Sequence, residues 1–366
     1  MLKISRDDGF TLTELMAGSA ITLVILSGAM TAFKDAMSVN DAGTQIADSS
    51  QNLRTGANLL VRDLMQAGRK VPIGGIPLPS GAGATPINRP SPPGGPVYTF
   101  DNVNQTTLTA IVSGYGLGPS VDNSTTDLIT FMMIDPLLGD LKVCDATTAV
   151  IPANNATIQS NAAFMTVAGT TTTNNFNWLV GDPANGISPV RAGDLIWFNT
   201  GGTALQTVTS TDATRVFFAA NDWFNFNQTA AAAGTLLKLR SAGKFPCGFT
   251  AARLIMYTYY VDATSTPGTP RLTRVLNHYS PQALAGVVED LDITYDLVDG
   301  VNNPTQVTSL PYTVNGLTYT ATQVRMVNLH MGVRSDTLSN QRHDYVRTHV
   351  STAISLRNLA FVASYQ

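Results

Sequence analysis

Charged residues are scarce in this chain of 366 residues, where they make up only 13% of the sequence. No run of Lys or Arg occurs, and the formal net charge is −3. The long-range attraction that drives nonspecific nucleic-acid binding therefore has no visible source, and we expect no nucleic-acid partner. Hydrophobic residues make up 44%, which is enough to bury a core and argues against a wholly disordered chain.

Catalytic motifs are missing as well. GxSxG, HExxH, Walker and dinucleotide-binding patterns do not occur, and the four histidines are scattered along the chain. Asp290, Asp292, Asp296 and Asp299 could attract calcium, but they lack the glycine and the terminal glutamate of an EF-hand loop. We therefore expect no enzyme, no metal site and no cofactor.

Cysteine is limited to Cys144 and Cys247, whose spacing fits no metal-ligand pattern. The two residues could form one disulfide if the body of the protein lies outside the cytoplasm. The alternative is a pair of buried thiols.

Thr, Asn, Ser, Gly and Ala are abundant, and this composition favours short strands joined by polar turns. Short β-branched or aromatic runs predict strands at residues 127–134, 194–198, 215–219 and 254–261. In the C-terminal third, apolar and polar residues alternate along 290–297, 327–334 and 345–359, as in half-buried antiparallel strands. We therefore expect a β-rich body from residue 97 to residue 366.

The N-terminal segment has a different character. Residues 15–33 are uncharged and apolar, and as a helix they would span about 28 Å, close to the hydrocarbon thickness of a bilayer. A cleaved secretory signal fits poorly, because Asp7 and Asp8 cancel the weak positive charge before the run. An ordinary signal anchor leaves Glu14 unexplained, although a carboxylate there is costly and implies a partner or a function.

The stretch Gly9-Phe10-Thr11-Leu12-Thr13-Glu14-Leu15 resembles the class III signal of type IV pilins and type II secretion pseudopilins. The resemblance implies that prepilin peptidase removes the leader 1–9 and methylates the new N-terminus, Phe10. It also implies that Glu14 pairs with the terminal amine of a neighbouring subunit. Such a pair would offset two unfavourable charges and fix the axial register between subunits.

Apolar residues continue at helical spacing beyond the first run, and no proline occurs between Phe10 and Val71. This stripe consists of Ile46, Leu53, Ala57, Leu60, Leu64 and Ala67, with Arg54, Arg62 and Asp63 off it. The pattern predicts a transmembrane or filament-core part at 10–34 and an amphipathic continuation at 35–70, ending near Gly68. Several glycines predict curvature and one break.

The segment 71–96 is rich in proline and glycine, which predicts an extended surface linker. We interpret it as a tether, with a contact surface for another subunit as the alternative. Seven aromatic residues gather in the middle of the chain and are more typical of a core than of a glycan or adhesion surface. They are Trp178, Trp197, Trp223, Phe217, Phe218, Phe224 and Phe226.

Three further stretches narrow the resemblance: 52–69 (NLRTGANLLVRDLMQAGR), Val288-Glu289-Asp290-Leu291, and the ending 350–358. They resemble the PilW family of minor pilins, and pseudopilin J of type II secretion ends similarly. The resemblance implies an α+β, pilin-like fold, in which a long N-terminal helix packs on an antiparallel sheet. It leaves residues 97–248 unaligned, and we interpret these as an insertion that enlarges the β-rich body.

By this resemblance the chain is a structural minor pilin, inserted once in the bacterial inner membrane with its C-terminal body in the periplasm. It would then join other pilin subunits in a type IV pilus at the cell surface, in an initiating or tip complex. The alternatives are a type II secretion pseudopilin and a membrane-anchored adhesion or glycan-binding protein.

Overall fold

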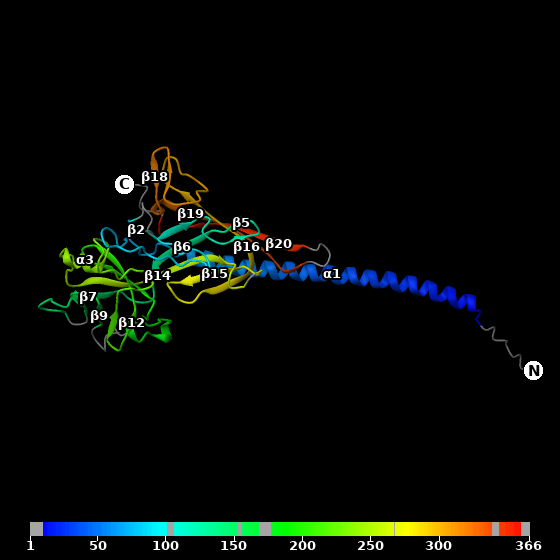
Figure 1. Cartoon of the computed structure of the whole chain (residues 1–366), viewed down its shortest axis with the longest axis horizontal. Helices are drawn as coiled ribbons and strands as arrows, with labels where there is room; N and C mark the ends of the chain where they lie inside the picture. Colours follow the sequence, from blue (N-terminus) through cyan, green and yellow to red (C-terminus); the bar gives the residue numbers. More distant parts are fainter. Residues whose placement is uncertain are drawn as a thin grey trace, which may run out of the picture. The chain divides into compact units, whose positions relative to one another are not determined.

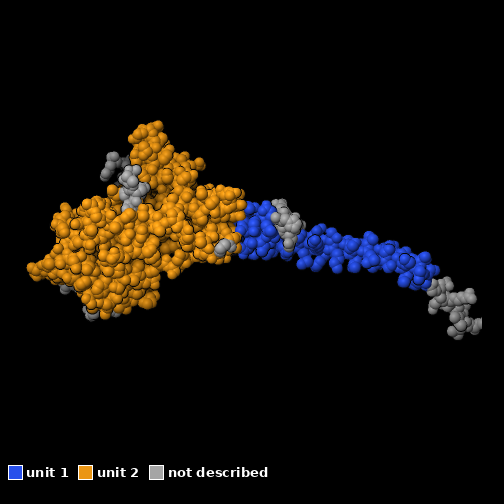
Figure 2. Space-filling view, viewed as in Figure 1, with its two compact units in different colours: residues 1–51, 334–348 blue, residues 52–333, 349–366 orange. Residues whose placement is uncertain are grey.

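The computed structural model describes residues 10–100, 106–152, 155–167, 177–266, 268–338 and 344–359. Gly9, the expected cleavage residue, lies outside the described residues. The chain divides into two compact units, residues 1–51 with 334–348 and residues 52–333 with 349–366 (Figure 2).

The N-terminal helix α1 runs without interruption from Leu12 to Leu64, over 53 residues (Figure 1). The predicted break is therefore wrong. Glycine costs only about 1 kcal/mol in a helix interior, and no proline is present to remove a backbone hydrogen bond. The helix ends slightly before the predicted Gly68, which has a φ of +79°, a left-handed conformation typical of the residue after a helix end.

The second part of α1 buries the predicted apolar stripe. Leu60 and Leu64 have no exposed surface, and Leu53, Ala57 and Ala67 are also buried. Close approach to the sheet needs Gly56, where an added Cβ would lie 2.7 Å from the Cβ of Ala285. One prediction needs correction, because Ile46 of the stripe is 48% exposed. Asp63, which the sequence pattern places off the stripe, is also buried.

One large sheet forms most of the body (Figure 1), and it has fourteen strands among the described residues. Its C-terminal part is antiparallel, in the order β14 (Phe249–Asp262), β15 (Arg271–Leu276), β16 (Gln282–Leu297), β19 (Val324–Leu338) and β20 (Tyr345–Ser355). Leu291 and Ile293 of β16 are buried while Asp292 is exposed, so the predicted alternation is confirmed. The buried face belongs to the same hydrophobic core as Leu60 and Leu64.

The other strands of this sheet come from the middle of the chain. Antiparallel pairing joins β3 (Ile111–Gly114) to β6 (Leu128–Ile134), β6 to β14, β10 (Leu195–Asn199) to β14, and β11 (Thr203–Thr207) to β10. The remaining members are β7 (Leu141–Asp145), β8 (Ala156–Ile158), β9 (Phe164–Thr166), β12 (Ser210–Thr211) and β13 (Arg215–Phe217), with β7 and β8 parallel. All four strands predicted in the middle region are thus confirmed, within a few residues at their ends.

Smaller elements complete the fold. Three two-stranded sheets pair β1 (Ile76–Pro77) with β2 (Thr107–Leu108), β4 (Ser120–Val121) with β5 (Ser124–Thr125), and β17 (Tyr312–Val314) with β18 (Leu317–Tyr319). Short helices occur at η1 (Pro183–Asn185), α3 (Leu236–Ser241) and η2 (Ala321–Gln323).

A second hydrophobic core lies among residues 138–251, which include Trp178, Phe198 and Phe218. Only part of the segment predicted as an insertion, 97–248, therefore packs on itself. Ile111, Phe131 and Phe224 belong to the main core with Leu60 and Leu64, and β6 and β10 hydrogen-bond to β14 of the main sheet. A disulfide joins Cys144 in β7 to Cys247 just before β14. This bridge closes the self-packed segment near the point where the chain returns to the main sheet.

The proline-rich segment 71–96 is not a free tether. Ile76 and Ile87 have no exposed surface, Leu78 is 1% exposed, and Arg89 is 2% exposed. Proline excludes a helix or an inner strand, but it does not prevent the apolar residues between prolines from entering a core. The buried Arg89 donates to the backbone oxygens of Ser113 and Val112 at 2.8 and 2.9 Å, and its burial lowers its pKa to about 10.

Candidate functional site

The first part of α1 presents apolar side chains that are exposed among the described residues. Phe10 is 89% exposed, and Leu15 and Phe33 are each 67% exposed. Residues 12–33 alone would span about 33 Å, slightly more than a bilayer's hydrocarbon core. The helix is thus long and apolar enough to cross a membrane, and its most apolar window is unburied. A buried core helix would not expose these side chains.

Hydroxyl groups within this apolar part are satisfied by the helix itself. Ser19 donates to the carbonyl oxygen of Met16 at 2.9 Å, and Thr22 donates to that of Gly18 at 2.7 Å. Ser27 and Thr31 make equivalent bonds about two turns further along the helix. These hydroxyls therefore add little to the cost of placing the segment in hydrocarbon, where an unmade hydrogen bond is expensive.

Glu14 has a partner within its own chain. Its carboxylate Oε2 accepts from the backbone N–H of Thr11 at 3.0 Å and from the Thr11 hydroxyl at 2.8 Å. The backbone N–H of Glu14 in turn donates to the Thr11 hydroxyl at 3.3 Å. This reciprocal arrangement is a capping box, whose sequence pattern is Ser or Thr followed three residues later by Glu or Gln. The sequence signal for this cap is Thr11 followed three residues later by Glu14.

A second polar site fastens α1 to the sheet within the larger unit. Asp63 is 2% exposed, and its Oδ2 accepts from the hydroxyl of Tyr259 at 2.7 Å and from Nη1 of Arg274 at 3.0 Å. Burial, together with the neighbouring carboxylate, raises the pKa of Tyr259, so its proton stays in place at neutral pH. The arrangement can hold the helix, because three side chains share one buried contact point.

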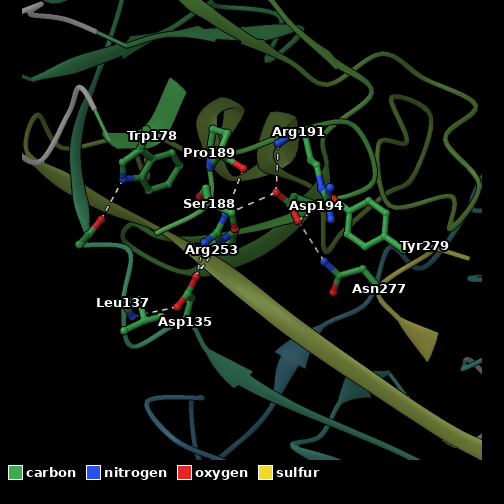
Figure 3. A network of polar contacts seen from close by, with 11 residues as sticks. Asp135, Leu137, Trp178, Ser188, Pro189, Arg191, Asp194, Arg253, Asn277 and Tyr279 are labelled. Carbon is green, nitrogen blue, oxygen red and sulfur yellow. Dashed lines mark hydrogen bonds and ion pairs between the residues drawn. The ribbon is translucent and has the colours of Figure 1, made fainter. Parts of the chain in front are cut away.

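A third polar network surrounds Arg253 of β14 (Figure 3). Its Nε donates to Oδ2 of Asp135 at 2.7 Å, and its Nη1 donates to the carbonyl oxygen of Ser188 at 2.8 Å. Asp194 accepts from the Tyr279 hydroxyl at 2.8 Å, and burial raises the pKa of Asp194.

A buried carboxylate with a raised pKa can indicate acid–base chemistry. Here all four oxygens of the two carboxylates are already engaged. Those of Asp135 bind Leu137 N–H and Arg253, and those of Asp194 bind Tyr279, Asn277, Arg191 N–H and, as an ion pair, Arg253. The network therefore holds the loop 182–194 against β14.

The aromatic residues of the middle region are mostly core residues, as predicted. Trp178 and Phe224 have no exposed surface, and Trp197, Phe218 and Phe226 are also buried. The partly exposed Trp223 stacks on His278 with ring centroids 3.9 Å apart. Across the described ranges, no group of three or more His, Cys, Asp or Glu side chains is arranged to hold a metal ion.

Comparison with protein-family models, with curated proteins and with solved structures finds no match to this chain. The features that bear on function are therefore the apolar helix, the sequence before it and the contacts of Glu14.

Proposed function

We propose that this chain is a structural minor pilin of a type IV pilus. In this proposal α1 anchors the newly made protein in the bacterial inner membrane with the body in the periplasm, and prepilin peptidase cuts between Gly9 and Phe10. The processed chain then joins other pilin subunits and reaches the cell surface in an initiating or tip complex. The observation that carries the proposal is an uncovered apolar helix that begins directly after Gly9-Phe10 and contains one early carboxylate, Glu14.

The exposed surface of residues 10–33 gives the proposal its mechanism. In the membrane, lipid covers these side chains, and in a filament the same surfaces would pack against equivalent helices. Cleavage would free an ammonium group at Phe10. The Glu14 carboxylate of another subunit could then pair with this ammonium group in place of its own Thr11. The exchange adds the attraction between two opposite charges to the hydrogen bond.

The first test is mass spectrometry of the N-terminus of the protein isolated from cells. We expect the chain to begin at an N-methylated Phe10. A mature chain that still begins at Met1, or one cut beyond residue 33, would contradict the proposal. Deletion of the gene should then reduce piliation, whereas an isolated loss of protein export would assign the chain to a type II secretion system instead.

The second test separates charge pairing from helix capping at Glu14. Glutamine can also serve in a capping box, so Glu14→Gln keeps the cap and removes the charge, whereas Glu14→Ala removes both. If the charge pairs with a neighbouring amine, both variants should be lost from sheared filaments while remaining in the membrane. Wild-type incorporation of Glu14→Gln would show that Glu14 only caps the helix.

Thr11→Ala provides the matched control, because it removes the side-chain half of the cap and keeps the carboxylate. Loss of a cap costs about 0.5–2 kcal/mol of helix stability. The long apolar helix should tolerate this loss, so incorporation of Thr11→Ala should stay close to wild type.

A further inference from the structure

A polar groove of about 700 Å³ lies on the face of β16, β19 and β20 that carries the polar residues of the alternating pattern. Asp292 of β16 stands directly opposite His330 of β19, and Thr294 stands opposite Asn328. Ser351 and Ala353 of β20 line one side, and Gln306 and Thr308 reach the groove from the loop after β16. All of these residues belong to the larger unit, and the volume lies in the range of small-molecule sites, about 300–1,000 Å³.

Several polar groups of the groove are held in fixed orientations. Asn328 donates from Nδ2 to Oδ1 of Asp296 at 2.9 Å, which leaves its side-chain oxygen as an acceptor. His330 shares a hydrogen bond of 2.8 Å between Nδ1 and the Ser351 hydroxyl. The same Asp296 oxygen accepts from the backbone N–H of Gln306 at 2.9 Å, which ties the loop to the strand. A ligand would therefore meet a largely preformed surface, which lowers the entropy cost of binding.

Other polar groups of the groove make no hydrogen bond to described residues. The carboxylate of Asp292, the side-chain amide of Gln306 and the hydroxyl of Thr308 make no hydrogen bond with the part of the chain that the structure describes. Together with the Asn328 oxygen, they offer both donors and acceptors. A hydroxyl-rich ligand suits this mixture, because each hydroxyl can donate one hydrogen bond and accept others.

The charge of the groove disfavours anionic ligands. Asp292 lies in the groove, where partial burial and the nearby Asp290 both raise its pKa. Among the described residues that line the groove, none is Lys or Arg. His330 is the lining's one basic side chain, and its Nε2 is 3.5 Å from Oδ2 of Asp290. Sulfate, phosphate and carboxylate groups would therefore meet repulsion, whereas an uncharged ligand would not.

We propose that this groove binds an uncharged oligosaccharide. Asp292 and Asn328 accept hydrogen bonds from sugar hydroxyls, Gln306 and Thr308 donate or accept at the loop side, and the Ala353 methyl group packs against the carbon face of a ring. The proposal does not depend on the assignment of the chain to a pilus, because every group involved lies in the larger unit.

Binding is tested with the full chain in a detergent that carries no sugar headgroup, by saturation-transfer NMR and calorimetry. The probes are three neutral oligosaccharides, maltotriose, chitotriose and lactose, and one anionic one, 3′-sialyllactose. We expect at least one neutral probe to bind with a millimolar or lower Kd, and 3′-sialyllactose to bind at least about tenfold more weakly, a difference of about 1.4 kcal/mol. Absence of binding by all three neutral probes, or equal binding of 3′-sialyllactose, would overturn the proposal.

Two variants locate the binding. Ala353→Trp fills the groove, and Asp292→Asn removes one charged acceptor at an exposed position without breaking a hydrogen bond seen in the structure. Each should weaken binding of the neutral probe by about tenfold or more, because Ala353→Trp blocks the groove and Asp292→Asn removes the stronger, charge-assisted hydrogen bond. Ala283→Trp makes the same change at an exposed position of β16 outside the groove and should leave the Kd unchanged. Binding that survives both groove variants would refute this site.

Discussion

The Tyr259 hydroxyl offers the sharpest test of how the helix is held on the sheet. In Tyr259→Phe, the ring stays in the core and only the hydrogen bond to Asp63 is lost. Asp63 keeps its bond from Arg274 at 3.0 Å, so the carboxylate is not left unpaired, and the larger penalty of an isolated buried charge does not arise.

The expected magnitude follows from the type of bond. A hydrogen bond to a charged acceptor contributes about 1.5–3 kcal/mol. If the helix lifts from the sheet in a local opening, the opening equilibrium should increase by about 10- to 150-fold. Amide hydrogen exchange across residues 57–64 of α1 should accelerate by the same factor.

Exchange is measured by mass spectrometry on the full chain in detergent, beside a control with the same chemical change. Tyr115→Phe is suitable, because Tyr115 is 59% exposed and its hydroxyl makes no hydrogen bond with any described residue. The control should change exchange by less than about twofold, as expected for surface substitutions within about 0.5 kcal/mol. If Tyr259→Phe behaves like this control, the buried contact does not hold the helix and the reasoning is wrong.

Two further predictions concern the larger unit. Replacing Cys144 and Cys247 together by Ser should lower the free energy of unfolding by about 2–5 kcal/mol, because the bridge spans a sequence separation of 103 residues. Urea unfolding followed by tryptophan fluorescence measures this loss. The parent protein with its disulfide reduced should lose the same amount of stability. Burial raises the pKa of Asp145, but hydrogen bonds from Arg240 and Thr147 outweigh this effect and hold the pKa below the usual 3.8. The stabilisation from the Asp145–Arg240 pair is therefore present above pH 3.8 and is lost as the pH falls through the lowered pKa. Asp145→Asn should thus lower the urea midpoint of unfolding at pH 7 but have little effect on it in strong acid.

The sequence predicts well those features that depend on neighbours in the chain. The apolar stripe Leu53, Ala57, Leu60 and Leu64 repeats at helical spacing, and all four residues are buried. The alternation along 290–297 likewise identifies the buried face of β16, because a half-buried strand must place every second side chain in the core. The periodicity of apolar residues thus identifies the buried face even when the tertiary contacts are unknown.

Features that depend on distant residues were not predictable in the same way. Asp63 looks like a solvent-facing residue until Tyr259 and Arg274, almost 200 or more positions later, meet it in the core. Segment 71–96 has the sequence of a linker, because its prolines exclude a helix or an inner strand. They do not indicate whether Ile76 and Ile87 are buried by distant parts of the chain. The polar groove requires the register between β16 and β19, which fixes Asp292 opposite His330 and is set by the fold as a whole.

In the proposed function, the position of Glu14 affects the free energy of both membrane insertion and filament assembly. A carboxylate at the centre of a membrane helix costs about 2.5–3.5 kcal/mol, but Glu14 lies in the first turn of α1, where unpaired N–H groups and the helix dipole favour a negative charge. Its bonds to Thr11 satisfy it without a second subunit. Under the proposed function, the unassembled chain would therefore reside in the bilayer with its carboxylate capped. In the proposed filament, Glu14 would give up its bonds to Thr11 only when the charged amine of another subunit is present. Insertion in the membrane would therefore need no second subunit, whereas filament assembly would need one.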